Sequence, residues 1–445
     1  MLDAVIVGAG ISGLTCGYSL TNAGKSVVIL ESSHRAGGMI GTEPQEGYTL
    51  EYGPNSLRND SPGLEALIND LGLTDKIIKP SLPRFKSYIA RSNRLVAIPR
   101  SPIEFISSDI LSFSAKLRLL REPFIKKADA DTDESVASFF RRRVGSETVE
   151  TLVNPMISGI FAGDSEQLSM NSAFAKFWNL EQQYGSLFRG VFATRKKNNS
   201  KLPRMFSFTK GLGTLIQALE NHLQDALLKQ SPVTSIIQTA DGWLTTTEDG
   251  RTFESASVIC TVPCLAASKL FPSIPEVKIL ENIYYPPVTV VHLGFDQNAI
   301  KQSLDGFGFL VPPKEKSDIL GCIFTSSLFP ERAPNGEALL TVMMGGTTNP
   351  TISELPQQEI IDIAVRTVST FLQITENPKF SRSFTWHSAI PQYHIGHQEI
   401  ISQIESIEVD HPGLHLIGNY RSGISIGSSI TQAVMTSNSI IVIGQ

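Results

Sequence analysis

The sequence predicts an α/β fold with additional α+β segments, in which an N-terminal strand–helix–strand unit is interleaved with two further lobes. Three observations support this prediction: a glycine turn between apolar strands within residues 2–31, strand patterns over residues 231–263, and a strand–turn–helix pattern over residues 413–434. The chain of 445 residues is also too long for one ordinary core, which favours two or three lobes.

The N-terminal unit begins with residues 2–8, LDAVIVG, an apolar run typical of a buried parallel strand. The turn Gly8-Ala9-Gly10-Ile11-Ser12-Gly13 follows, then a helix-period segment and a second apolar run that stops at Glu31. Gly8 permits the tight turn, Gly10 lets the backbone approach a pyrophosphate, and Gly13 lets helix and strand pack closely. An acid about twenty residues after such a turn accepts hydrogen bonds from ribose hydroxyls. This context predicts a Rossmann-like dinucleotide-binding domain.

The residues after Glu31 distinguish between the dinucleotides that such a domain binds. The segment SSHRAGGMIGT resembles the RxGG element of a large FAD family that includes amine oxidases, phytoene desaturases and protoporphyrinogen oxidases. The resemblance implies that Arg35, Gly37 and Gly38 line the flavin diphosphate, and therefore that the cofactor is FAD. An ordinary Gly-Gly turn is the alternative interpretation of this segment alone.

A second dinucleotide unit is not expected. The glycines of KGLGTL at residues 210–215 have no preceding strand pattern and no downstream acid. With one such unit, reduced flavin is expected to pass its electrons to oxygen or a small acceptor instead of to bound NAD(P). The pattern therefore predicts an oxidase.

Several longer segments resemble one branch of that family, the FAD- and oxygen-dependent protoporphyrinogen oxidases. They are LVNPMISGIFAGDSEQLSMNSAF, LGCIFTSSLFPERAPNGEALLTVMMGG, AIPQYHIGH and GLHLIGNYRSGISIGSSI, and the likeness runs from residue 1 to about residue 434. The resemblance implies a six-electron oxidation of protoporphyrinogen IX to protoporphyrin IX in haem biosynthesis. It would use three oxygen molecules, release hydrogen peroxide and class the enzyme among oxidoreductases acting on CH–CH donors.

The resemblance also implies where the cofactor and the substrate bind. The flavin contacts fall on Gly8, Ala9, Gly10, Ile11, Ser12, Gly13, Glu31, Arg35, Gly37, Gly38, Met39, Gly53, Pro54, Asn55, Ser56, Val233, Asn419, Ile424, Ser425 and Ile426. The substrate-orienting residues fall on Asn55, Ala162, Gly163, Leu310 and Met343.

Two positions depart from the family pattern. A phenylalanine that stacks on a pyrrole ring usually occupies the position of Met343, and methionine is apolar and polarizable enough to replace it. An arginine that pairs with a substrate propionate often occupies the position of Ser87. On a strand Lys86 points away from Ser87, so we predict that Arg84 or Arg91 provides the propionate contact instead.

No side chain is assigned as a catalytic acid or base, because the flavin supplies the redox chemistry and the protein positions the substrate. The histidines His387, His394 and His397 could suggest a metal site. They lack a matching Cys, Asp or Glu partner nearby, and the flanking Pro and Gly residues indicate a loop. We therefore predict no metal.

The interleaved pattern suggests three regions. Residues 1–80, 205–270 and 405–445 are expected to form the FAD-binding domain, with a hairpin over 231–263 and a helix that Ser61 caps and Pro62 begins. Residues 271–404 are expected to form a substrate-binding lobe with a mixed sheet and a helix over 357–374. Residues 81–204 are expected to form a helical, basic, membrane-associating lobe.

The membrane expectation rests on charge. Residues 84–127 carry ten Lys and Arg against three Asp and Glu, interleaved with Ile, Leu and Phe, and basic runs continue at residues 141–143 and between Arg189 and Lys210. In a chain with a net charge of -5 this is a concentrated positive face. It suits an anionic membrane surface, although a solvated helical face has the same pattern.

The net charge, the cysteines and the hydrophobic segments of the whole chain limit the partners and the cellular location that we expect. A net charge of -5 gives no reason to expect nucleic acid, and four scattered cysteines are typical of reduced thiols. No targeting peptide and no spanning segment is recognised, so we expect a cytoplasmic, bacterial-type protein that is peripheral on the membrane surface. The expected partners are a porphyrinogen, oxygen and the membrane, and we consider a homodimer and a ferrochelatase contact as further partners.

Three rival functions remain at this stage. An amine oxidase typically has a flavin-facing lysine and an aromatic cage, whereas residues 418–426 offer Gly and Ser with Tyr420 as the one aromatic residue. A coproporphyrinogen III oxidase would need a more basic pocket, because its substrate carries four propionates. The absence of the family's arginine at Ser87 argues against such a pocket. A non-catalytic flavin-binding scaffold is the third alternative.

Overall fold

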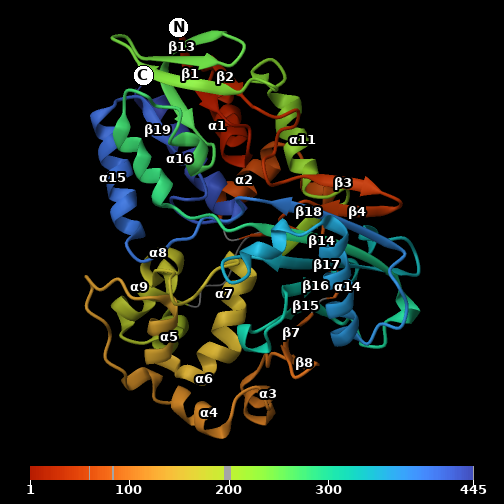
Figure 1. The fold of residues 1–445 in the computed structure, drawn as a ribbon. Coiled ribbons are helices and arrows are strands. Elements are labelled where there is room, and N and C mark those ends of the chain that lie inside the picture. Colours follow the sequence, from red (N-terminus) through yellow and green to blue (C-terminus); the bar gives the residue numbers. More distant parts are fainter. Residues whose placement is uncertain (60, 83–84, 195–201, 444–445) are drawn as a thin grey trace.

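The computed structural model describes residues 1–59, 61–82, 85–194 and 202–443. These residues form three packed regions (Figure 1). One sheet-and-helix region holds both termini, a second sheet lies beside it, and a group of helices lies at the end furthest from the termini. The predicted α/β fold with added α+β segments is confirmed.

The region with both termini is built around a seven-stranded sheet. Five strands pair in parallel, and two more extend the sheet by antiparallel pairing. The parallel strands are β10 (Leu227–Leu228), β2 (Val27–Leu30), β1 (Leu2–Val7), β13 (Thr252–Cys260) and β19 (Leu414–Leu416), and the antiparallel ones are β12 (Trp243–Thr247) and β11 (Val233–Gln238). β12 and β13 form the predicted hairpin around an Asp-Gly turn.

Helices cover both faces of this sheet, so its strands are continuous apolar runs. Ala4 and Ile6 of β1 face one core, whereas Val5 and Val7 face the other. The first core is completed by α1 (Ile11–Asn22), α2 (Pro62–Asp70), α11 (Gly213–His222) and α16 (Ile426–Ile443). The second is completed by α12 (Cys264–Ala267), η4 (Pro275–Asn282) and α15 (His397–Asp410).

The second sheet is mixed and also has seven strands. In spatial order they are β18 (Phe380–Trp386), β14 (Val288–Asp296), β17 (Glu337–Gly345), β16 (Ile319–Ile323), β15 (Gly306–Leu310), β7 (Lys86–Arg91) and β8 (Arg94–Ala97). One face packs on α14 (Gln357–Leu372), the helix predicted over 357–374. The opposite face points toward the first region, where Met343 clusters with Met39.

Short strands connect the two sheets. β3 (Thr42–Gln45) pairs with β4 (Tyr48–Glu51), and Tyr48 packs in one cluster with Leu339 and Phe380 of the second sheet. A three-stranded sheet follows. Its strands are β5 (Leu57–Arg58), β9 (Met205–Phe208) and β6 (Ile77–Ile78).

The helices furthest from the termini come from residues 102–193. They are α3 (Pro102–Ser107), α4 (Phe113–Leu119), η2 (Glu122–Phe124), α5 (Val136–Val144), α6 (Ser146–Thr148), η3 (Val149–Val153), α7 (Asn154–Phe161), α8 (Met170–Ala173), α9 (Ala175–Tyr184) and α10 (Leu187–Ala193). The remaining short helices are η1 (Thr74–Lys76), η5 (Gln297–Ala299), η6 (Pro313–Glu315), α13 (Thr325–Leu328), η7 (Pro330–Arg332) and η8 (Pro350–Glu354).

The packing of three segments differs from the expected region boundaries. Residues 86–97 form β7 and β8 of the second sheet, so the segment expected to be helical from residue 81 becomes helical only at α3. η4 packs with the first sheet, although it follows residue 271. α15 begins at His397 and crosses the expected boundary at residue 405. Contacts between residues that are distant in the sequence determine where these three segments pack, and a local sequence pattern does not show such contacts.

The run Arg141–Arg143 is not part of an open basic face. Arg143 is fully buried, and its guanidinium contacts the carboxylates of Glu122, at 3.1 Å, and Glu181. Arg142 pairs with Glu181 and Glu134, and Arg141 pairs with Glu166. The prediction that this run continues the basic surface is wrong, because Arg143 is buried and each of the three guanidiniums pairs with a carboxylate. Residues 195–201, which hold much of the other run, lie outside the described part of the chain.

Candidate active site

The expected cofactor residues follow the ends of parallel strands in the first sheet. β1 leads into Gly8, β2 into Glu31, and β19 into the segment that contains Asn419. Since the carboxyl ends of parallel strands share one edge, these three segments lie at the same edge of the sheet. This is the edge at which open α/β sheets bind their ligands.

The glycine turn at this edge has the geometry that a pyrophosphate requires. Gly8 has a positive φ of 98°, and a Cβ at Gly13 would lie 2.0 Å from the Gly8 carbonyl oxygen. Gly10 begins α1 with an extended backbone, and a Cβ built there meets no atom of the described chain within 4 Å. Gly8 and Gly13 therefore serve the protein's own packing, whereas the space over Gly10 is free for a ligand at the helix N-terminus. Ala9, Ile11 and Ser12 complete this turn and the first turn of α1.

Glu31 lies beside the glycine turn. Its carboxylate accepts hydrogen bonds from the backbone N–H of Ala9 (2.8 Å) and of Ser33 (2.9 Å). The Glu31 carbonyl accepts from the Ser231 N–H, which brings β11 and Val233 close to the same place. The two residues expected around the adenosine are therefore brought together by the fold.

The second glycine element also reaches the turn. The Gly37 N–H donates to the Ala9 carbonyl, and a Cβ at Gly38 would lie 3.4 Å from the Gly10 Cα. Arg35 donates to the Gly38 carbonyl at 2.6 Å, and its guanidinium lies over the Tyr52 ring at 5.0 Å. Arg35 thus shapes the loop that carries Gly37 and Gly38, in addition to its expected role beside the diphosphate.

The GPNS segment adjoins this loop. A Cβ at Gly53 would lie 2.9 Å from the Met39 carbonyl oxygen, and Pro54 and Ser56 belong to the same turn. The Asn55 amide donates to the Gly53 carbonyl at 3.2 Å, while its buried oxygen has no donor among the described residues. Because buried acceptors are normally satisfied, this oxygen fits a site that a ligand completes.

A buried carboxylate fixes β4, the strand that leads into GPNS. Glu51 accepts hydrogen bonds from the Leu212 N–H (2.9 Å) and the Thr42 hydroxyl (2.6 Å), and the Arg332 guanidinium lies 3.4 Å away. Burial raises the pKa of Glu51 to about 7, and the charge of Arg332 opposes that shift. The His292 ring contacts the Glu51 carbonyl at 3.0 Å, which links this strand to the second sheet.

The C-terminal segment brings a second helix N-terminus to the same edge. The Ser425 hydroxyl accepts from the Ser428 N–H at 3.0 Å and so caps α16, which begins at Ile426. α16 packs on α1, and both helices start at the carboxyl edge of the sheet. Ile424 packs on the core of the helical lobe instead, so the segment from Asn419 to Ile426 connects the two regions.

The free face of the second sheet carries the expected substrate residues. Cross-strand pairing aligns Leu310 with Gly321, Gly321 with Met343, and Met343 with Val290. Tyr88, Phe309 and Val342, which alternate with this row, belong to the core under α14. Since side chains alternate between faces, Leu310 and Met343 lie on the face opposite α14.

The end of α7 closes over this face. Ala162 caps α7 with a left-handed backbone and shares one apolar cluster with Met39 and Met343. A Cβ at Gly159 would lie 2.5 Å from the Leu310 side chain. Residues expected to contact the substrate thus meet Met39, which follows Gly37 and Gly38. Gly163 lies one residue further on, beside the buried Gln392.

The residues of the propionate prediction lie on or next to β7 in the sequence. Ser87 lies on β7, and Arg91 shares its face of the sheet because two alternations separate them. Arg91 is exposed and donates to the Asp109 carbonyl at 2.8 Å, four residues along the strand from Ser87. Arg84 lies outside the described residues. The structure therefore does not bring Arg91 to the position that Ser87 occupies.

The histidines serve other contacts. His397 bonds the Tyr420 carbonyl at 2.9 Å, and His394 stacks on Tyr284 with ring centroids 6.2 Å apart. Within the described ranges, no three His, Cys, Asp or Glu side chains are grouped as metal ligands.

One residue of this edge was not expected from the sequence. The Thr261 hydroxyl donates to the carbonyls of Val7 and Gly8, both at 3.0 Å. It therefore holds the glycine turn against the end of β13. The apolar run before Thr261 marks a buried strand end, but nothing local shows that this strand pairs with β1.

The expectation for KGLGTL needs one correction. A strand, β9, does precede it, and α11 follows it. β9 belongs to the small sheet with β5 and β6, and the Gly213 N–H donates to Thr42 instead of facing an open edge. The segment is therefore a packing turn, not a second nucleotide site.

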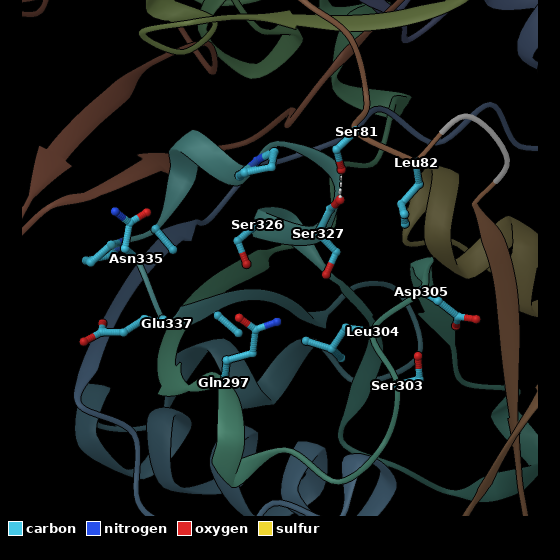
Figure 2. Close-up of a pocket in the computed structure, with 15 residues that line it drawn as sticks. Ser81, Leu82, Gln297, Ser303, Leu304, Asp305, Ser326, Ser327, Asn335 and Glu337 are labelled. Atoms are coloured by element: carbon cyan, nitrogen blue, oxygen red, sulfur yellow. Dashed lines mark hydrogen bonds between the residues drawn. The ribbon is translucent and has the colours of Figure 1, made fainter.

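A polar hollow of about 460 Å³ lies elsewhere, at one end of the second sheet (Figure 2). Ser81, Gln297, Asp305, Asn335 and Glu337 line it, and the Ser81 hydroxyl donates to the Ser327 carbonyl. None of the expected cofactor or substrate residues lines this hollow.

Comparison with known proteins identifies the architecture. The sequence model of the family of flavin-containing amine oxidoreductases matches residues 11–441 of this chain. The chain belongs to this family. It is therefore an oxidoreductase, and FAD is its cofactor, as Arg35–Gly38 predicted. The residues at the sheet edge fit FAD. The space over Gly10 has room for a phosphate group, and the buried Asn55 oxygen, which has no donor among the described residues, can accept a hydrogen bond from a ligand.

Among curated relatives of this flavoenzyme are two kinds of porphyrinogen oxidase. The chloroplastic protoporphyrinogen oxidase of Nicotiana tabacum is 34% identical over 97% of this chain and 84% of its own length. The coproporphyrinogen III oxidase of Bacillus subtilis is 29% identical over 96% of this chain and 95% of its own length.

Solved structures share the fold over nearly the whole chain. A protein assigned as a protoporphyrinogen oxidase from Exiguobacterium sp. 255-15 superposes with a TM-score of 0.85 at 25% identity, over 99% of both chains. Cyclohexylamine oxidase from Brevibacterium oxydans superposes with a TM-score of 0.73 at 16% identity, over 99% of both chains.

Proposed function

We propose that this flavoenzyme oxidises protoporphyrinogen IX to protoporphyrin IX, using oxygen and releasing hydrogen peroxide. The observation that carries the proposal is the apolar surface formed by Leu310, Met343 and Ala162 near Met39, which follows Gly37 and Gly38. A large apolar macrocycle fits such a surface, and relatives with this reaction in their names match almost the whole chain.

The chemistry divides between the cofactor and the chain. FAD, when bound, would supply the redox chemistry in two-electron steps, so a six-electron oxidation would consume three oxygen molecules and release three of hydrogen peroxide. The chain orients one bridging carbon through Asn55, Ala162, Gly163, Leu310 and Met343, and it excludes water with the apolar cluster around Met343. No described side chain is needed as a general acid.

Coproporphyrinogen III is the second candidate substrate, and the Bacillus subtilis relative favours it. It carries four propionates, which call for more cations than protoporphyrinogen needs. Ser87 stands where the family often has an arginine, and this favours the substrate with two propionates. Arg84 or Arg91 stays our prediction for the propionate contact, tested by the Michaelis constant of the double alanine variant.

The test supplies each porphyrinogen separately, in air, to the FAD-loaded protein. We expect porphyrin fluorescence and three equivalents of peroxide from protoporphyrinogen IX, with a higher kcat/KM than for coproporphyrinogen III. Monoamines serve as the control for the amine oxidase alternative and should give no peroxide. Turnover of neither porphyrinogen would overturn the proposal, and a preference for coproporphyrinogen would replace the substrate.

We further propose that the helical lobe associates with the surface of an anionic membrane. Its outer elements expose large apolar side chains, among them Ile103 (80% exposed), Phe113 (77%) and Phe124 (83%). Arg121 and Lys126 are exposed beside them. Apolar side chains with flanking cations bind the headgroup region of anionic bilayers. No helix in the described ranges is long and apolar enough to cross a membrane.

Replacing Phe113 and Phe124 by serine is expected to weaken binding to anionic vesicles at least about tenfold. Burying one phenylalanine side chain in an apolar environment contributes about 1.5–3 kcal/mol to the free energy of binding. Flotation with phosphatidylserine vesicles at low and high salt measures it. Val409→Ser is the matched control, because Val409 is equally exposed (77%) but lies on α15. Equal flotation of the double variant and the wild type would contradict the proposal.

The remaining partner and location expectations stay predictions. The predicted cytoplasmic location is tested by fractionation of expressing cells. A homodimer and a contact with ferrochelatase are tested by sedimentation of the FAD-loaded protein alone and with that enzyme.

A further inference from the structure

Residues 392–397 lie between the two loops that border the site. On one side is the end of α7, residues 161–163, which carries Ala162 and Gly163; we call it the substrate loop. On the other side are residues 419–423, which lead to the cap of α16; we call them the flavin loop. The Tyr393 carbonyl accepts from the Ser169 N–H at 2.8 Å, which fixes this segment against α8. In Figure 1, α8 lies below the lower end of α15.

Gln392 contacts the substrate loop. It is 1% exposed, and its amide donates to the carbonyls of Phe161 (2.8 Å) and Ile390 (3.0 Å). Phe161 is the last residue of α7, so this bond satisfies a carbonyl that the helix leaves unpaired. The Gln392 oxygen lies 2.2 Å from where a Cβ of Gly163 would be, and it has no donor among the described residues.

Tyr393 contacts the flavin loop. Its hydroxyl donates to the Asn419 carbonyl and accepts from the Gly423 N–H at 3.0 Å, so one oxygen joins both ends of the loop. The ring also packs edge-on against Phe161, with centroids 6.0 Å apart. Tyr393 therefore touches both loops, and it is 2% exposed.

His397 reinforces the same loop. Its ring stacks on Tyr393 with centroids 4.3 Å apart, and its Nε2 lies 2.9 Å from the Tyr420 carbonyl. Burial lowers the pKa of His397 to about 4, so the ring is neutral near pH 7 and donates its one proton to that carbonyl. Three polar backbone atoms of the flavin loop are thus held by two side chains of one short segment.

We infer that Gln392 and Tyr393 are positioning residues that set the substrate loop and the flavin loop at a fixed separation. The inference rests on the proposed function, in which a bridging carbon of the substrate must lie against the flavin. A displacement of about 1 Å in such a geometry costs about 100-fold in rate. Both side chains are assigned through their hydrogen bonds to the two loops, so we class them as positioning residues and not as catalytic residues.

The test compares Tyr393→Phe with Tyr88→Phe. Both tyrosines are buried and donate to one acceptor, but Tyr88 bonds Asp305 on the α14 side of the second sheet. We expect Tyr393→Phe to weaken FAD binding about tenfold, because the substitution removes two hydrogen bonds that hold the flavin loop. We also expect it to shift the flavin absorption spectrum. Tyr88→Phe should leave both unchanged. FAD affinity is measured by flavin fluorescence with no substrate present.

The second arm uses Gln392→Leu, which keeps the side chain's bulk and removes its donor. We expect it to raise KM for the porphyrinogen and to slow flavin reduction in a single turnover, with unchanged FAD affinity. Combined with Tyr393→Phe, the effects on the reduction rate should be non-additive, because both residues fix one separation.

The outcomes separate this inference from the proposed function. If neither porphyrinogen is oxidised, the proposed function fails, while the FAD affinity and spectrum of Tyr393→Phe still test the flavin-loop contact. If Tyr393→Phe matches Tyr88→Phe in FAD affinity, spectrum and reduction rate, the inference is overturned. Strictly additive effects of the two substitutions would also overturn it.

Discussion

Replacing Gly10 by alanine is expected to abolish tight FAD binding while leaving the apoprotein folded. The Gly10 backbone has φ of -68°, which any residue adopts, and a Cβ there meets no described atom within 4 Å. The methyl group would instead occupy the space into which the pyrophosphate approaches the N-terminus of α1. We expect a loss of about 10- to 100-fold in FAD affinity, equivalent to one charge-assisted hydrogen bond of roughly 1.5–3 kcal/mol.

The neighbouring glycine gives the contrasting variant. A Cβ at Gly13 would lie 2.0 Å from the Gly8 carbonyl oxygen, so Gly13→Ala should destabilise the apoprotein itself. Gly63→Ala is the control, because its Cβ would have ordinary contacts at 3.6 Å on α2, away from the cofactor residues. FAD titration and thermal unfolding of each apoprotein measure the effects. Unchanged FAD affinity in Gly10→Ala would mean that the pyrophosphate does not pass over Gly10.

Replacing Arg143 by methionine is expected to lower the free energy of unfolding by about 3–5 kcal/mol. The guanidinium is fully buried between the carboxylates of Glu122 and Glu181, which are also fully buried. Removing it leaves those two carboxylates without their shared cation. Glu122 additionally accepts from the Ser186 hydroxyl (2.6 Å) and the Leu187 N–H (2.8 Å), so the start of α10 depends on the same network.

Arg141→Met is the matched control, two residues away in the same run. Arg141 pairs with Glu166 on the surface, where both side chains are about half exposed, and such pairs contribute less than about 1 kcal/mol. Denaturant unfolding of the FAD-loaded variants measures the difference. Equal losses for the two substitutions would show that the Arg143 network does not stabilise the fold.

The same pair of variants separates stability from membrane binding. Each substitution removes one positive charge from residues 141–143, and both side chains are paired with carboxylates. Neither should therefore change flotation with anionic vesicles as strongly as the Phe113 and Phe124 substitutions do.

The N-terminal unit could be predicted because its pattern is local. An apolar run, three glycines at fixed spacing and Glu31 specify the strand, the turn and the second strand within about thirty residues. The backbone angles of Gly8 and the close approach at Gly13 require glycine whatever the rest of the chain does. The hairpin of β12 and β13 and the helix α14 were predictable for the same reason.

Other features depend on pairing over long distances along the chain. β7 joins the second sheet by pairing with β15, more than 200 residues later, so its place could not be seen in residues 81–100. Arg143 looked like one more exposed cation, because the carboxylates that bury it come from η2 and α9. Gln392 and Tyr393 belonged to a recognisable segment, yet their partners at Phe161, Asn419 and Gly423 are distant in sequence.

The sequence by itself determined that a dinucleotide binds, because such a cofactor is held mainly by backbone geometry that glycine spacing encodes. The segment from Arg35 to Gly38, through its family resemblance, narrowed the dinucleotide to FAD. It also determined the two-sheet composition and the resemblance that the family match bears out. The tertiary structure alone decided which face of the second sheet meets Met39, and which basic residues are neutralised. It also decided which side chains hold the two loops of the site. These depend on the burial and pairing of residues that only folding brings together.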